Sequence, residues 1–113
     1  MPDFEDLRMI DLLKTFRQDI VAIEEQRSAQ LFKQASKDLQ SIYAFHLNAR
    51  DTFVGVEHYL KSLYTSFNYA AAIINDALKK KHIEEKKSAM LDECLEVMIK
   101  CCDVVTTLLK KKK

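Results

Sequence analysis

The residues best able to hold a metal ion or carry redox chemistry are the three cysteines, Cys94, Cys101 and Cys102. Their spacing argues against a zinc site, because Cys94 and Cys101 lie about 10 Å apart along a helix axis and Cys101 and Cys102 diverge by about 100°. Cys94, Met98 and Cys102 offer soft sulfur atoms to copper(I), but three such residues are a weak signal. We therefore predict no metal site and no cofactor.

The cysteines fit the buried face of an amphipathic helix better than a reactive site. At about 100° per residue they share one side of a helix with four apolar residues, namely Leu91, Met98, Val105 and Leu109. Asp92, Glu96 and Asp103 fall on the opposite side. Because free cysteine packs as a small hydrophobic residue, we predict that these thiols are structural.

The histidines give little support for catalysis. His46 lies in an apolar pattern and is predicted to be a hydrogen-bonded histidine of the core or of an interface. No Glu-x-x-His motif occurs, which argues against a ferritin-like di-iron bundle. The chain resembles the small helical ribonucleases of the HEPN type only in size and helicity. In its segment RDTFVGVEH, Arg50 and His58 are farther apart in the sequence than the arginine and histidine that this family pairs. A ribonuclease using these two residues is the third functional hypothesis.

One glycine and one proline in 113 residues predict an all-α fold, because sheets and turn-rich folds use both residues frequently. The same count excludes phosphate-binding loops, dinucleotide-binding turns and nucleophile elbows, which need several glycines. The length fits a single domain over residues 1–113.

Four helical segments are expected in an antiparallel bundle, near residues 3–25, 29–48, 52–80 and 87–110. Asp3 begins the first helix, the polar run EEQRSAQ ends it, and Ser28 caps the second. In this arrangement Asn48 ends the second helix and Asp51 or Thr52 caps the third. Whether residues 29–80 form one helix or two stays open. A single long helix would leave three helices and would require a second copy to cover its middle.

A long apolar seam supports both arrangements. Its steps alternate between three and four residues, as in helical bundles and coiled coils. It contains Phe32, Ala35, Leu39, Ile42, His46, Ala49, Phe53, Val56, Leu60, Leu63, Phe67, Ala70, Ile74 and Ala77.

The candidate contact residues lie in and after the third segment. Tyr59 and Tyr69 do not fit the seam and are predicted to be surface contacts. Basic residues cluster around the connection to the last segment: Lys79, Lys80, Lys81, Lys86 and Lys87. Four further lysines close the chain at positions 110–113. The net charge is only +1, so a global basic footprint for nucleic acid is missing.

The location is expected to be cytoplasmic. The longest uninterrupted apolar run, YAAAII, is far shorter than the roughly 20 residues of a spanning helix. The acidic start MPDFEDLRMID differs from a secretory signal, and an odd number of cysteines fits a reducing compartment.

These observations favour a non-catalytic helical module for protein–protein interaction, such as an adaptor, a scaffold or an oligomerisation domain. A protein partner is expected, a homodimer is left open, and no small-molecule substrate is expected. The second hypothesis is binding of an anionic surface, a membrane lipid or a nucleic acid, through the terminal lysine clusters.

Overall fold

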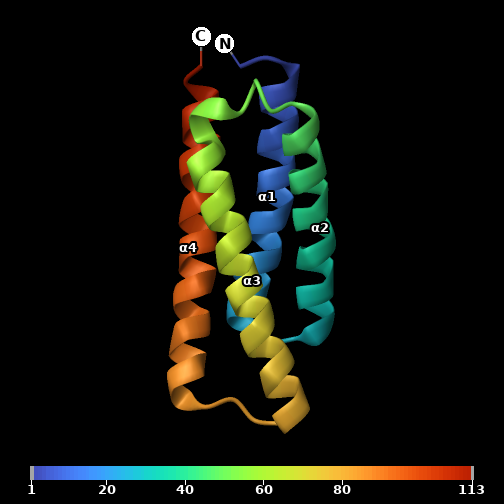
Figure 1. Cartoon of the computed structure of the whole chain (residues 1–113), viewed down its shortest axis with the longest axis vertical. Coiled ribbons are helices and arrows are strands. Elements are labelled where there is room, and N and C mark those ends of the chain that lie inside the picture. The colour runs from blue at the N-terminus through green and yellow to red at the C-terminus, as the bar shows by residue number, and fades with distance from the viewer. Residues whose placement is uncertain (1, 113) are drawn as a thin grey trace.

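The structure is a computed structural model that describes residues 2–112, and it is an all-α bundle of four helices. In chain order these are α1 (Phe4–Glu25), α2 (Ala29–Asn48), α3 (Glu57–Lys80) and α4 (Glu85–Lys110). The helices run up and down, so both termini and the α2–α3 connection lie at one end of the bundle (Figure 1). The predicted antiparallel bundle is confirmed in its four-helix form. The alternative with one long central helix over residues 29–80 is wrong.

Two helix starts follow from local side-chain chemistry. Asp3 accepts a hydrogen bond from the backbone N–H of Asp6 at 2.9 Å, and Asp6 accepts one from the N–H of Asp3 at 3.1 Å. This reciprocal capping box satisfies backbone donors that have no partner inside the helix. Ser28 Oγ accepts from the N–H of Leu31 at 3.4 Å, as expected for the residue before α2. The predicted start of the first helix near Asp3 and the predicted cap Ser28 of the second helix are therefore confirmed.

The start of the third helix was predicted wrongly. After Asn48 the chain makes a turn and a short 3-10 helix, η1 (Val54–Val56), and α3 begins only at Glu57. Neither Asp51 nor Thr52 caps α3. The reason is tertiary: Phe53 and Val56 are buried and close the end of the core, while Thr52 Oγ1 donates to Glu5 Oε1 at 3.1 Å. The fourth helix also begins two residues earlier than predicted, at Glu85.

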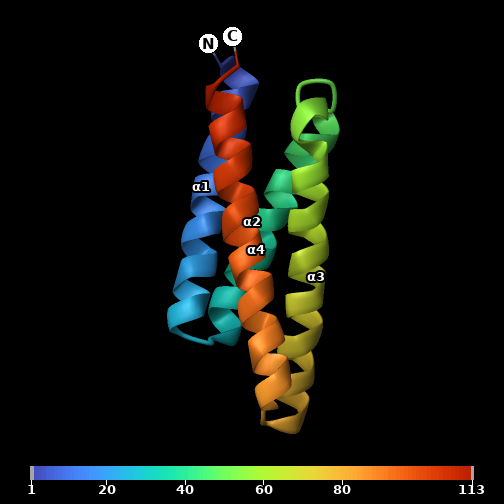
Figure 2. The ribbon, with the colours of Figure 1, turned by 90° about the vertical axis from the view of Figure 1, so that its left-hand side faces the viewer.

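The helices do not pack evenly around the core. Helix α4 packs against α1 and α3, and α1 packs against α2, whereas the backbones of α2 and α3 are close at few points and these two helices meet mainly through side chains, such as those of Phe32 and Phe67. Helices α3 and α4 also extend beyond the α1–α2 turn (Figure 2). The predicted seam is buried from Phe32 to Ala70, but Ile74 and Ala77 are only partly covered, because this part of α3 has no helix fully opposite it.

Candidate partner-binding surface

The two tyrosines predicted as surface contacts differ in exposure. Tyr69 on α3 is 62% exposed. Tyr59 is half-buried and packs against the core. An exposed aromatic ring offers a partner a large apolar area, so Tyr69 is the stronger candidate of the two for a contact residue.

The predicted lysines gather at the end of α3 and the start of α4, but they do not form a uniform patch. Lys80 and Lys87 both pair with Asp76, at 3.4 and 3.0 Å. The hydrogen bond from Lys87 holds the pKa of Asp76 below its usual value. Lys79, Lys81 and Lys86 are exposed and make no ion pair within residues 2–112. Lys87 therefore joins α4 to α3, whereas the pair of Lys80 with Asp76 lies within α3.

The C-terminal lysines include one that is structural. Lys112 Nζ lies 3.0 Å from Asp6 Oδ1 and donates to the carbonyl oxygen of Thr52 at 2.6 Å. Its ammonium also lies 5.9 Å from the centre of the Phe53 ring. Lys113 lies outside the described residues. No pattern in the sequence indicates these contacts of Lys112 with α1 and with the α2–α3 connection.

The cysteines lie where the helical pattern placed them. Cys101 and Cys102 are buried and Cys94 is half-buried, all as free thiols. Burial raises the pKa of Cys102 to about 12, so its reactive thiolate is scarce near neutral pH. Within residues 2–112, no cluster of three or more histidine, cysteine or acidic side chains is placed to hold a metal ion.

Two of the histidines lie in contrasting environments, His46 in the core and His58 at the surface. His46 is buried, and its Nδ1 lies 3.0 Å from the Tyr64 hydroxyl, which confirms the prediction of a hydrogen-bonded core histidine. Burial also lowers the pKa of His46. Arg50 lies in the turn after α2 and His58 in the first turn of α3, and both are exposed. The ring of His58 packs edge-on to Tyr59 at 5.6 Å.

The surface that sequence reasoning missed is a second apolar stripe on α4, which we call the α4 outer stripe. It consists of Met90, Cys94, Val97, Cys101, Val104 and Leu108. The buried stripe of the same helix lies one position further along: Leu91, Leu95, Met98, Cys102, Val105 and Leu109. Four members of the outer stripe are exposed by 37 to 45%, namely Met90, Val97, Val104 and Leu108. Its alternating steps of four and three residues can be read in the sequence, but sequence reasoning assigned Cys94 and Cys101 to the buried face and did not consider the other four residues as a stripe.

Tyr69 and the α4 outer stripe meet in a shallow depression between α3 and α4. The depression has a volume of about 390 Å³. Helix α3 contributes Ser66, Tyr69 and Ile73, and α4 contributes Met90, Glu93, Cys94 and Val97. We call these seven residues the α3–α4 face. It combines small and large apolar groups with a single charged residue.

Among the residues described, no helix is long and apolar enough to cross a bilayer. The comparisons with known proteins add no constraint on function. No protein-family model, curated protein or solved structure matches this chain.

Proposed function

We propose that this chain is a non-catalytic helical interaction module, an adaptor, scaffold or oligomerisation domain, whose partner binds the α3–α4 face. The observation that carries the proposal is the position of Tyr69, which is 62% exposed beside Met90 and Val97. Binding energy at interfaces concentrates on such aromatic anchors, and the surrounding apolar groups exclude water from them.

The shape of the surface favours an amphipathic helix as the partner. The α4 outer stripe repeats every three and four residues, which is the spacing that helices use to pack against one another. The depression beside it lies between two helices, and a partner helix lays its apolar face into grooves of this kind. A helix from a second copy of this chain would produce an oligomer, and a helix from another protein would produce an adaptor complex.

The lysine clusters support the alternative of anionic-surface binding less well. Lys80 and Lys87 share the one carboxylate of Asp76, and Lys112 is engaged by Asp6. The exposed lysines that remain are spread over both ends of an elongated molecule 48 Å long. A flat anionic surface would engage few of them at once.

Substitution of Val97 by glutamate tests the proposal. Val97 is 40% exposed, so Val97→Glu should leave the fold intact while placing a charge in the α3–α4 face. Leu47→Glu is the matched control, because Leu47 is 44% exposed on α2, away from this face. The purified chain is weighed by light scattering at two concentrations, and partners are recovered by affinity capture and weighed in the complex.

The expected result is a dimer or a stoichiometric complex that forms with the unchanged chain and with Leu47→Glu but is lost with Val97→Glu. Thermal unfolding of each variant shows that it is folded. Recovery of the same complex with Val97→Glu would place the interface elsewhere and refute the proposed face.

A further inference from the structure

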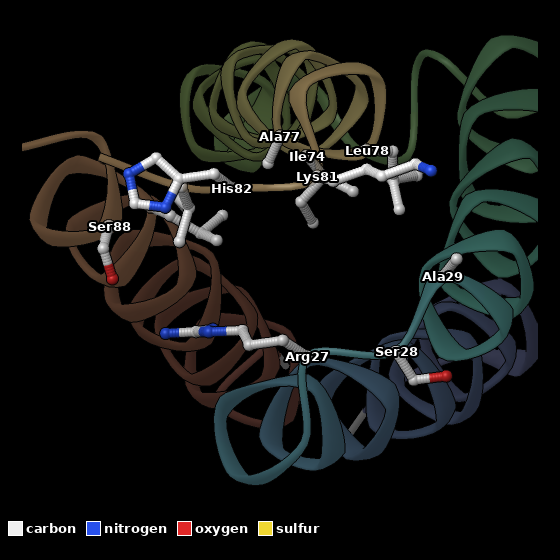
Figure 3. Close-up of a pocket in the computed structure, with 11 residues that line it drawn as sticks. Arg27, Ser28, Ala29, Ile74, Ala77, Leu78, Lys81, His82 and Ser88 are labelled. Carbon is white, nitrogen blue, oxygen red and sulfur yellow. The ribbon is translucent and has the colours of Figure 1, made fainter. Parts of the chain in front are cut away.

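A second hollow lies away from the α3–α4 face, at the end of the bundle opposite the termini. It has a volume of about 390 Å³ and is framed by the α1–α2 turn, the start of α2, the end of α3 and the start of α4 (Figure 3). It exists because α3 and α4 extend past the α1–α2 turn and because the backbones of α2 and α3 are close at few points. It shares no lining residue with the α3–α4 face.

The walls of this cavity are apolar and its rim is basic. The apolar lining consists of Ala29, Ile74, Ala77, Leu78, Ile83 and Leu91. The ionisable residues that line it are Arg27, Lys81 and His82, and none of the lining residues is acidic. Arg27 is paired with Asp92, so Lys81 is the cationic group of the lining that is left for a ligand.

Figure 3 shows how these groups are arranged around the opening. Ile74 and Leu78 lie on the α3 side, and Ala29 lies opposite them on α2. Lys81 and His82 project along the rim in opposite directions, with Lys81 reaching toward α2. Lys81 ends α3 in the left-handed conformation, with φ of 56°, and this turns the chain so that two basic residues follow each other at the mouth.

The cavity continues as a groove between α2 and α3. A smaller hollow of about 220 Å³ shares Ala29, Ile74 and Leu78 with it. Its walls include Phe32 and Phe67, whose rings stack at 4.8 Å and are themselves buried. From Ala71 to Lys81 the two hollows follow α3 over about 15 Å, a length that an extended dodecyl chain matches.

We propose that this cavity binds a single-chain anionic amphiphile of the fatty-acid class. The alkyl chain lies along the groove between α2 and α3, and the carboxylate lies at the mouth beside the ammonium of Lys81, which reaches toward α2. The volume falls within the range of about 300 to 1,000 Å³ that is usual for small-ligand sites. Apolar walls with a few polar groups at one end are the arrangement that such a ligand requires, since they bury its chain and fix the direction of its head group.

The first test is calorimetric titration of the full chain with dodecanoate, below its micelle-forming concentration and at neutral pH. Saturable binding at one site per chain is expected, with dodecanol and dodecylammonium about fivefold weaker or more, because they lack the charge that the rim attracts. Vesicles of phosphatidylglycerol serve as a separate arm. Binding to these vesicles without saturable binding of monomeric dodecanoate would show surface attraction alone and would overturn the proposal.

Two pairs of variants locate the site. Ala77→Phe fills the cavity and should abolish saturable binding, whereas Ala44→Phe adds the same ring at an exposed position on α2 and should not.

Lys81→Asn removes the rim charge and keeps a residue that tolerates the left-handed conformation. It should weaken dodecanoate binding about fivefold, while Lys79→Asn, which removes an equal charge outside the cavity lining, should change it less than about twofold.

The charge variants keep the test decisive if Ala77→Phe fails to fold. The assigned role of the rim would be refuted if the unchanged chain bound dodecanoate and dodecanol with equal affinity. It would also be refuted if Lys81→Asn and Lys79→Asn weakened dodecanoate binding equally. Unchanged affinity in a folded Ala77→Phe variant would refute the site itself.

Discussion

Lys112 and Asp6 lie 106 positions apart in the chain and form an ion pair of 3.0 Å at the end of the bundle that carries both termini. The Asp6 side chain is only 2% exposed. It accepts from the N–H of Asp3 through one oxygen and from Lys112 through the other. Lys112 thereby fastens the C-terminal end of the chain to the first turn of α1 and, through the carbonyl of Thr52, to the α2–α3 connection.

Removal of this ammonium should destabilise the fold. Lys112→Ala leaves a buried carboxylate with one partner fewer, and we expect a loss of about 1 to 2 kcal/mol because Lys112 itself is partly exposed to solvent. Urea unfolding measures the difference. Lys110→Ala, at an exposed position of the same helix end, should stay within about 0.5 kcal/mol. Equal effects of the two variants would contradict a structural role for Lys112.

Asp19 on α1 gives the fold a dependence on pH. Burial and the nearby carboxyl group of Asp38 on α2 raise the pKa of Asp19 to about 7. Its Oδ2 is buried and has no donor within the described residues, so a proton shared with Asp38 would satisfy it. Since the unfolded chain releases this proton near pH 4 and the folded chain near pH 7, stability contributed by Asp19 falls as pH rises between these values.

Asp19→Asn should therefore be more stable than the unchanged chain above pH 7. We expect a gain of about 1 to 2 kcal/mol at pH 8, after allowance for solvent screening, and little gain near pH 4. Urea unfolding at both pH values measures it, with Asp11→Asn as the exposed control on α1. A gain that is the same at both pH values would contradict the shifted titration.

The contact between His46 and Tyr64 should stabilise the fold through one hydrogen bond. Tyr64→Phe leaves the buried His46 Nδ1 without its partner and should cost about 1 kcal/mol in the free energy of unfolding. Tyr43→Phe is the control, because Tyr43 is 49% exposed and its hydroxyl makes no hydrogen bond within residues 2–112. Since burial lowers the pKa of His46, its contribution to stability should decline as pH falls below about 6.5.

The thiols should differ in reactivity. In the folded chain, iodoacetamide should modify the half-buried Cys94 first and Cys101 and Cys102 far more slowly, because both are buried and burial raises the pKa of each. Mass spectrometry after timed quenching measures the order of modification, and denaturant should abolish the difference between the thiols.

Cys101→Ser should destabilise the fold by about 1 kcal/mol, because it places a hydroxyl in the apolar interior.

The single glycine should be dispensable. Gly55 does not have a positive φ, and a Cβ added there meets no heavy atom within 4 Å. Gly55→Ala should therefore be neutral or stabilise the fold by about 0.4 to 1 kcal/mol, because it restricts the unfolded chain. A thermal melt is sufficient to measure this, and a clear loss of stability would reveal a backbone requirement at η1.

Much of the fold was predictable because it depends on neighbours in the sequence. Asp3 and Ser28 cap helices through hydrogen bonds that span three residues, and the apolar period of α1 and α4 identifies their buried faces. The near absence of glycine and proline settled the helical class. The burial of Cys101 and Cys102 followed from the same period.

The tertiary structure decided what depends on distant partners. The chain between Asn48 and Glu57 follows the burial of Phe53 and Val56 rather than the local capping signals. Four residues of the α4 outer stripe are exposed because α1 and α3 cover only part of a wide apolar face. The cavity exists because α3 and α4 extend past the α1–α2 turn. The sequence by itself determined the helices and their inner faces, since these arise from interactions within a few residues. Which apolar groups remain uncovered was decided by the packing of whole helices against one another.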